Sequence, residues 1–131
     1  MKHFLLSVAL VGCVVLPAQA DLTEDFNSAQ GSWTTETQVT LPSGKWTFGG
    51  GAQANTSNGV AAIKFNDNGA YMISPAVDSV KSLSFSYRSG GSNKRIAIAY
   101  QIGAGDWQAV DTLLIKSSTS AMSSYSKTIG L

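Results

Sequence analysis

The sequence predicts an all-β fold: an antiparallel β-sandwich, preceded by a helical signal peptide. Three observations predict it. Apolar and polar residues alternate over most of the chain, which is typical of strands with one buried face. Clusters of Gly, Asn and Ser separate these stretches, and no long helical periodicity interrupts them. The expected strands are 34–41, 45–48, 61–65, 70–74, 82–88, 95–102, 108–115 and 125–129.

The first twenty residues have the order of an export signal. Lys2 supplies a positive charge, Phe4–Leu16 is apolar, and Ala18-Gln19-Ala20 is a small-x-small cleavage site. The apolar stretch is shorter than the ~20 residues that a membrane span requires. We therefore expect a signal peptide over 1–20 and one β-sandwich domain over 21–131, without a transmembrane span. This predicts an exported protein that is secreted, periplasmic or located at the cell surface.

A second interpretation of the same segment is a lipid anchor. Leu10-Val11-Gly12-Cys13 has the form of a lipobox, which would leave Cys13 lipidated. That cleavage would keep the apolar Val14–Leu16 at the new terminus and leave the Ala-Gln-Ala site unused. Cleavage after Ala20 is therefore the favoured prediction, with lipidation at Cys13 as the alternative.

The only histidine and the only cysteine, His3 and Cys13, both lie within this signal. A mature chain without them has no Ser-His-Asp or Cys-His site and no ordinary His/Cys zinc site. The carboxylates form no recognisable pair for glycoside chemistry. We therefore expect no catalytic residues, no metal and no cofactor. The sequence Asn66–Gly69 contains oxygen ligands that suit calcium, but it lacks the EF-hand spacing and is better explained as a tight turn.

Charge indicates no nucleic-acid partner. The chain has nine basic and eight acidic residues, so removal of Lys2 balances the charge of the mature domain. No basic run or stripe is present, and binding to polyanions by bulk charge is not expected.

The clearest hairpin prediction joins 83–88 to 95–101 through a Gly-rich turn. Pairing Tyr87 with Ile96 brings the apolar faces together, and Phe85 and Leu83 then pair with Ile98 and Tyr100. This register places Arg88 opposite Arg95 on the polar face. The pair is either a two-arginine clamp for a carboxylate, a sulfate or an acidic sugar, or two solvated side chains at a hairpin mouth.

Trp107 is the strongest candidate for a binding residue. Pairing Ile98 with Thr112 in the next hairpin points Trp107 outward, together with Ala109 and Asp111, beside Gln101. An aromatic ring beside small and hydrogen-bonding residues is typical of a sugar-binding platform. The predicted ligand-binding residues are Trp107, Gln101, Asp111, Arg88 and Arg95. In the alternative, a β-bulge near Gly105-Asp106 turns Trp107 into the core.

The other tryptophans are interpreted as structural. Trp46 and Phe48 share one face of a short strand, which predicts that they pack between the sheets. Trp33 is expected to seal an edge of the sandwich.

Several motifs together resemble a known family, the jelly-roll modules of secreted Bacteroidota-type proteins, which are related to cleaved-adhesin and choice-of-anchor domains. The motifs that carry the resemblance are 25–26, 31–33, 71–77, 82–88, 96–100 and 105–107. The resemblance covers most of residues 24–130 and implies a non-catalytic, extracellular or cell-surface module that binds glycan or protein. It supplies no fixed set of binding residues.

The family usually continues beyond the strand seen here as Tyr125–Ile129 and adds strands that complete the sandwich. We therefore expect a domain that lacks its last strands and has an open sheet edge, where a protein partner could add a strand. The favoured function is carbohydrate binding through an exposed sheet face. The alternatives are a structural or adhesive sandwich that contacts protein, and the accessory module of a longer secreted hydrolase or nuclease.

Overall fold

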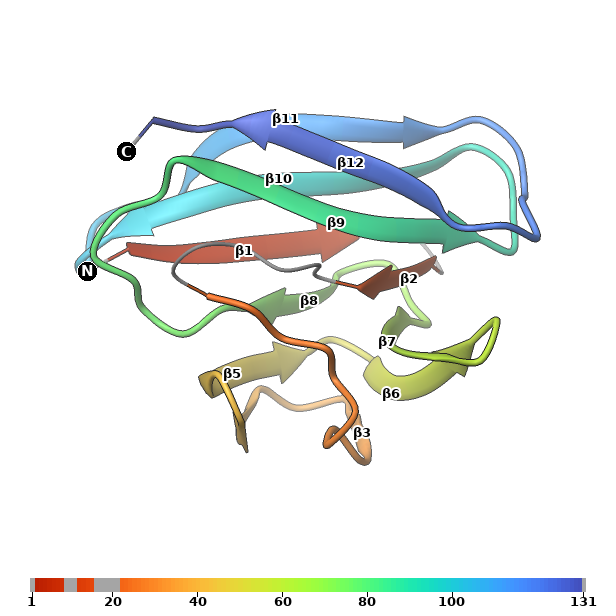
Figure 1. Cartoon of the computed structure of the whole chain (residues 1–131), viewed down its shortest axis with the longest axis horizontal. Helices are drawn as coiled ribbons and strands as arrows, with labels where there is room; N and C mark the ends of the chain where they lie inside the picture. The colour runs from red at the N-terminus through yellow and green to blue at the C-terminus, as the bar shows by residue number, and fades with distance from the viewer. Residues whose placement is uncertain (1, 9–11, 16–21, 131) are drawn as a thin grey trace.

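A computed structural model describes residues 2–8, 12–15 and 22–130. The fold is all-β, with two six-stranded antiparallel sheets in two layers (Figure 1). Sheet A has the order β11-β10-β1-β8-β5-β4 and sheet B the order β12-β9-β2-β7-β6-β3. The bounds in sheet A are β1 Lys2–Val8, β4 Thr37–Leu41, β5 Gly44–Gly49, β8 Ala70–Ile73, β10 Lys94–Ile102 and β11 Gln108–Ile115. Those in sheet B are β2 Gly12–Val15, β3 Ser32–Trp33, β6 Ala52–Ser57, β7 Val60–Phe65, β9 Ser82–Ser89 and β12 Ser123–Thr128.

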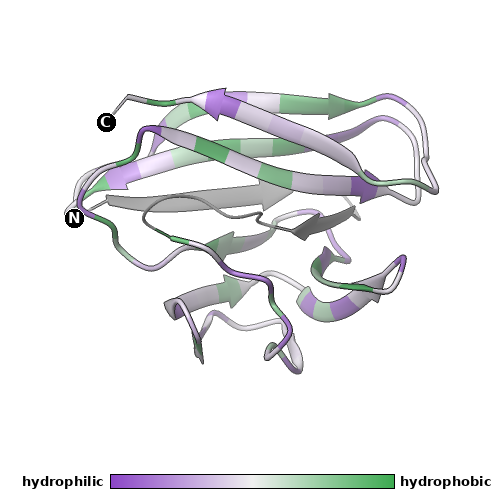
Figure 2. Ribbon diagram, viewed as in Figure 1, coloured by the Kyte–Doolittle hydropathy of each residue, from purple (hydrophilic) through white to green (hydrophobic). Residues whose placement is uncertain are grey.

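The core forms between the two sheets, as the alternation of apolar residues predicts. Hydrophobic and hydrophilic residues alternate along β9 (Figure 2), and exposed and buried residues alternate over Arg95–Ile98 of β10. Trp46 and Phe48 are fully buried, which confirms that they pack between the sheets. Trp33 lies in the edge strand β3 and stacks on Phe48 at 4.4 Å between ring centroids, so it does seal an edge.

A run of three glycines carries the chain from β5 in sheet A to β6 in sheet B. Gly50 and Gly51 adopt positive φ angles of 66° and 103°. A Cβ on Gly50 would lie 2.3 Å from the carbonyl oxygen of Gly69, and one on Gly51 would lie 2.5 Å from Asp67. Both the conformation and the space therefore require glycine at this corner. The turn predicted at Asn66–Gly69 is present, closed by the Ala70 N–H donating to the Asp67 carbonyl at 3.2 Å.

The predicted hairpin between 83–88 and 95–101 is wrong. β9 belongs to sheet B and β10 to sheet A, so the Gly-rich segment between them crosses from one layer to the other. Both strands still direct their apolar faces into the same core, where Phe85, Ile96 and Ile98 are buried. The alternation is compatible with pairing across a ladder and with packing across layers, and the structure has the second arrangement.

The predicted register of the β10–β11 hairpin is also wrong, by one residue up to Ile98 and by two residues from Ala99 on. Ile98 pairs with Asp111 instead of Thr112, and Ala99 pairs with Ala109. Val110 is therefore an extra residue that forms a β-bulge in β11. This bulge lies within β11, whereas the alternative prediction placed a bulge before the strand, near Gly105-Asp106.

The N-terminal segment is extended where the sequence predicts a helix. β1 lies between β10 and β8, and β2 lies between β9 and β7, with antiparallel pairing on both sides (Figure 1). Its β-branched and aromatic residues are compatible with strands as well as with an apolar helix. The cleavage site at Ala18–Ala20 lies outside the described residues. No helix in the described part of the chain is long and apolar enough to span a bilayer.

Candidate carbohydrate-binding face

Three of the predicted site residues, Gln101, Trp107 and Arg95, belong to the outer face of sheet A or to the loop at its end. On β10 this face carries Ala97, Ala99 and Gln101, because Ile96 and Ile98 face the core. Ala99 pairs with Ala109 on β11, so small side chains lie next to one another across the hairpin. We call Ala97, Ala99, Gln101, Ala109 and Trp107 the outer strip.

Trp107 comes immediately before β11 and has the same parity as Ala109. It is half-buried and does not belong to the core that the described residues form. At this end of the hairpin, the Gln101 side-chain amide donates to the Gly105 carbonyl at 2.7 Å and holds the 103–106 loop. Trp107 and Gln101 therefore lie at the same end of one hairpin, which is the part of the predicted site that the structure brings together.

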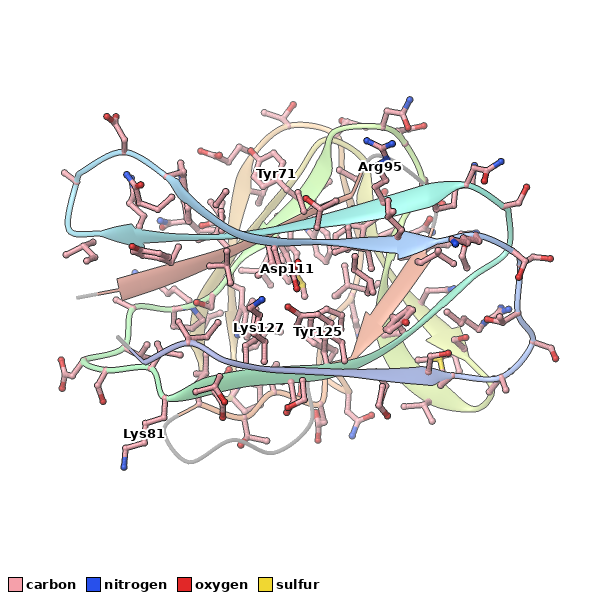
Figure 3. All side chains as sticks on the ribbon, turned by 90° about the horizontal axis from the view of Figure 1, so that it is seen from above. Tyr71, Lys81, Arg95, Asp111, Tyr125 and Lys127 are labelled. Carbon is pink, nitrogen blue, oxygen red and sulfur yellow. The ribbon has the colours of Figure 1, made fainter. Side chains whose placement is uncertain are left out.

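Asp111 is not on this face, contrary to the prediction. The bulge at Val110 reverses its direction, so that Asp111 pairs with the buried Ile98 and points between the sheets. There Tyr125 donates its hydroxyl to Asp111 Oδ2 at 2.8 Å, and Lys127 Nζ lies 3.5 Å from the same oxygen. The three side chains converge between β11 and β12 (Figure 3). We call Asp111, Tyr125 and Lys127 the edge clasp.

The contacts of the clasp shift the pKa values of Asp111 and Tyr125. The hydrogen bond from Tyr125 lowers the pKa of Asp111, with a further contribution from the Thr112 N–H and from the positive charge of Lys127. Burial raises the pKa of Tyr125, and the hydrogen bond and negative charge of Asp111 raise it further. The arrangement holds one carboxylate ionised and one phenol protonated, which suits a structural contact between the two edge strands.

The two arginines lie apart and do not form a clamp. Arg88 is in sheet B, where its Nε donates to Ser57 Oγ at 2.5 Å and its Nη1 donates to the Thr119 carbonyl at 3.2 Å. Arg88 is therefore a tie between β9, β6 and the loop that precedes β12. Arg95 is exposed on sheet A, roughly 20 Å from Gln101 along the strand at ~3.3 Å per residue.

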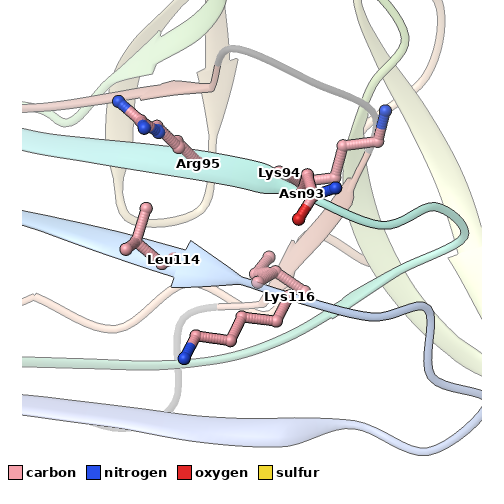
Figure 4. A pocket seen from close by; sticks show the side chains of 6 residues that line it. Asn93, Lys94, Arg95, Leu114 and Lys116 are labelled. Atoms are coloured by element: carbon pink, nitrogen blue, oxygen red, sulfur yellow. The ribbon is translucent and has the colours of Figure 1, made fainter.

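A shallow hollow of about 380 Å³ lies at the Arg95 end of the hairpin. Its lining residues are Asn93, Lys94, Arg95, Leu114, Ile115 and Lys116. The side chains of Lys94, Arg95 and Lys116 extend in different directions from their strands (Figure 4). Three cations that diverge do not surround a common anion, so this hollow is a weaker candidate than the outer strip.

Tyr71 is a neighbour of this face that the sequence analysis missed. It lies on β8 over Gly49, where a Cβ would be 2.6 Å from its ring, and its hydroxyl donates to Glu36 at 2.5 Å. Burial raises the pKa of Tyr71 to about 12, and the hydrogen bond and charge of Glu36 contribute. Tyr71 and Arg95 are seen on the side of β10 away from the edge clasp (Figure 3). The alternation of residues 70–74 already predicts that Tyr71 and Met72 point to opposite faces of the strand. Gly49 pairs with Tyr71, and a glycine beside a tyrosine on a neighbouring strand is the sequence signal for this contact.

The described residues contain no group of three or more His, Cys, Asp or Glu side chains that could hold a metal ion. Comparison with family models, curated proteins and solved structures finds no match to this chain.

Proposed function

We propose that residues 21–131 form a non-catalytic, extracellular module that binds carbohydrate through the outer strip of sheet A. The observation that carries the proposal is Trp107, a half-exposed tryptophan outside the core beside Ala109 and Gln101. A flat ring stacks on the apolar C–H face of a sugar, while small neighbours leave room for the next ring. Gln101 donates its side-chain amide N–H to the Gly105 carbonyl, and its side-chain carbonyl oxygen can accept a hydrogen bond from a sugar hydroxyl.

The proposal includes export and the jelly-roll family. The Ala18–Ala20 site and the apolar segment before it support cleavage of a signal. Two antiparallel layers and the motifs around Tyr71, Phe85 and Trp107 support a jelly-roll module of the cleaved-adhesin type. Arg88 and Asp111 are not part of the proposed site, because their side chains form hydrogen bonds elsewhere in the fold, with Ser57 and Tyr125. Arg95 remains at the far end of the same face, where an acidic sugar could reach it.

The test is thermal unfolding of the exported protein with a panel of neutral and acidic polysaccharides. A ligand at about 100 times its dissociation constant adds ~2.7 kcal/mol of stability, which is a shift of several degrees for a domain of this size. Trp107→Ala should abolish the shift and leave the unliganded melting temperature nearly unchanged. Leu114→Ala is the matched control, since Leu114 is exposed on the same hairpin at the other end.

Quenching of tryptophan fluorescence by acrylamide gives an independent measurement. Trp33 and Trp46 are buried, so the quenchable fraction should come from Trp107 and disappear in Trp107→Phe. A domain whose melting temperature no polysaccharide changes would contradict the proposal.

A structural or adhesive role in protein contacts is the second candidate. Leu114 and Ile102 are large hydrophobic residues of the β10–β11 hairpin that are 54% and 53% exposed. The two side chains lie at opposite ends of the hairpin, and each offers an apolar surface that a protein contact would cover. In that case Leu114→Ala, and not Trp107→Ala, should reduce binding to the partner.

A further inference from the structure

The N-terminal strands occupy the interior of both sheets. β1 joins the β11–β10 pair to the β8–β5–β4 group of sheet A, and β2 joins β12–β9 to β7–β6–β3 in sheet B. In this strand order, β10 does not pair with β8, and β9 does not pair with β7. A chain without residues 1–20 therefore has two interior strand positions to fill, one in each sheet, each roughly 10 Å wide at ~4.8 Å per strand spacing.

We propose that the exported domain fills these two positions with an extended segment of a partner polypeptide. The inference rests on the export part of the proposed function. An export peptidase would hydrolyse the Ala20–Asp21 bond with one water, leaving a carboxylate on Ala20 and an amine on Asp21. Removal of the segment exposes backbone donors and acceptors on β8 and β10 and on β7 and β9, and unpaired strands of this kind recruit other strands.

The register defines the chemistry of the partner segment. In sheet A, positions 6 and 8 pair with Ile98 and Ile96, which are fully buried, and also with Met72 and Ala70, which are fully buried as well. Position 5 pairs with Ala99 and Ile73, which are only partly buried. The partner strand must therefore run antiparallel to β10 and β8 and carry an apolar residue at every second position.

A partner chain fits these positions better than a second copy of the domain. The strands from Trp33 to Thr128 already pair within their own sheets, so a second copy could donate one only by breaking that pairing. A free segment of another polypeptide breaks no existing strand pairing when it binds, although it loses conformational entropy. The N-terminal segment of the chain itself shows which kind of segment fits the two positions. It forms one strand in sheet A at 2–8 and a shorter strand in sheet B at 12–15.

The experiment adds synthetic peptides to the exported protein, whose N-terminal residue is first determined by sequencing. The first peptide has the sequence of residues 2–15 with Cys13→Ser. The second carries Leu6→Asp, and the third carries Leu5→Asp. We expect the first and third peptides to raise the melting temperature by several degrees and the second to have no effect. Peptides that act equally, or a monomeric domain that no peptide stabilises and that melts as high as the intact chain, would overturn the proposal.

The intact chain, produced without export, gives a test that does not depend on peptide solubility. Leu6→Asp should lower its melting temperature much more than Leu5→Asp, and equal effects would contradict the register. An exported protein that keeps residues 2–15 would overturn this inference and the export part of the proposed function. Polysaccharide shifts in the same protein would then still report on carbohydrate binding. A dimer that excludes the first peptide would overturn the choice of a partner chain.

Discussion

The two edges of the structure are closed in different ways. At the edge formed by β3 and β4, aromatic rings pack in the core: Trp33 stacks on Phe48, and Phe26 meets Trp46 edge-on at 5.2 Å. At the opposite edge, β11 and β12 are joined by Asp111, Tyr125 and Lys127, of which Asp111 and Lys127 are 35% and 42% exposed. The first edge is stabilised by apolar burial and the second by solvent-accessible polar contacts. We therefore expect the two edges to differ strongly in their sensitivity to mutation.

The aromatic edge also contains a buried carboxylate. Glu24 is 1% exposed, and its oxygens accept from the Phe26 N–H at 3.1 Å, the Ser43 N–H at 3.2 Å and the Ser43 hydroxyl at 2.5 Å. Trp46 donates its indole N–H to the same Ser43 hydroxyl at 2.8 Å. A buried carboxylate that accepts three hydrogen bonds fixes the segment that leads into the domain.

The largest effect is expected for Trp46→Ala. The indole is fully buried, so its removal leaves a large cavity and should cost about 3–5 kcal/mol of unfolding free energy. Urea denaturation measures this as a lower midpoint. Trp107→Ala is the matched control and should cost less than about 1 kcal/mol, because Trp107 lies outside the core. Similar losses for the two tryptophans would contradict the distinction between core and outer strip.

Glu24→Ala is expected to come next, at about 2–3 kcal/mol, because it leaves buried donors of Phe26 and Ser43 without their acceptor. Glu24→Gln should cost less, since the amide oxygen still accepts. Asp25→Ala is the control at the neighbouring exposed carboxylate and should change the midpoint little. A loss for Asp25→Ala as large as that for Glu24→Ala would show that burial at this edge is not the cause.

Asp111→Asn should cost only about 1 kcal/mol or less at neutral pH, because the clasp is partly exposed and screened by solvent. The hydrogen bond from Tyr125 lowers the pKa of Asp111 below its ordinary 3.8. The contribution of the carboxylate is therefore present above pH 3.8 and is lost as the pH falls through the lowered value. Denaturation midpoints of the parent and of Asp111→Asn should converge in acid. A constant difference down to low pH would exclude the titration of this carboxylate as the cause.

The smallest effect is expected for Tyr71→Phe, and only in alkali. The pKa of Tyr71 is raised from 10.0 to about 12, so the protonated phenol stabilises the fold fully below pH 10. That contribution is lost between pH 10 and about pH 12, because the unfolded chain ionises first. Tyr71→Phe should therefore reduce the alkaline loss of stability, as measured by melting temperature against pH. Glu36→Gln should act in the same direction.

The sequence predicts the strands well and their partners poorly. The predicted strand 108–115 coincides with β11, and Trp46, Phe48 and the turn at 66–69 are placed as expected. Alternation indicates which residues of a strand face the core. It does not indicate to which of the two sheets the strand belongs, because both sheets contribute side chains to the same core. Phe85 and Ile98 therefore satisfy the same pattern as cross-strand partners and as residues packed from opposite layers. The hairpin between 83–88 and 95–101 was wrong for this reason.

The candidate site was predicted only in part, because one bulge changes the parity of a strand. Val110 lies outside the regular pairing, so Trp107 and Ala109 keep their outward parity while Asp111 turns inward. No composition signal marks that bulge, since Val110 is an ordinary strand residue. The strand β6 was not predicted because its residues 55–57 are polar and resemble a turn. The strands β1 and β2 were not predicted because an apolar N-terminal segment resembles a helix.

The position of β1 also has a consequence for the time course of folding. Leu6 is synthesised long before its partner Ile98, which lies far along the chain. Contacts between such distant residues form late, because a long loop must close before they contribute. Sheet A therefore cannot be completed until β10 and β11 have emerged from the ribosome.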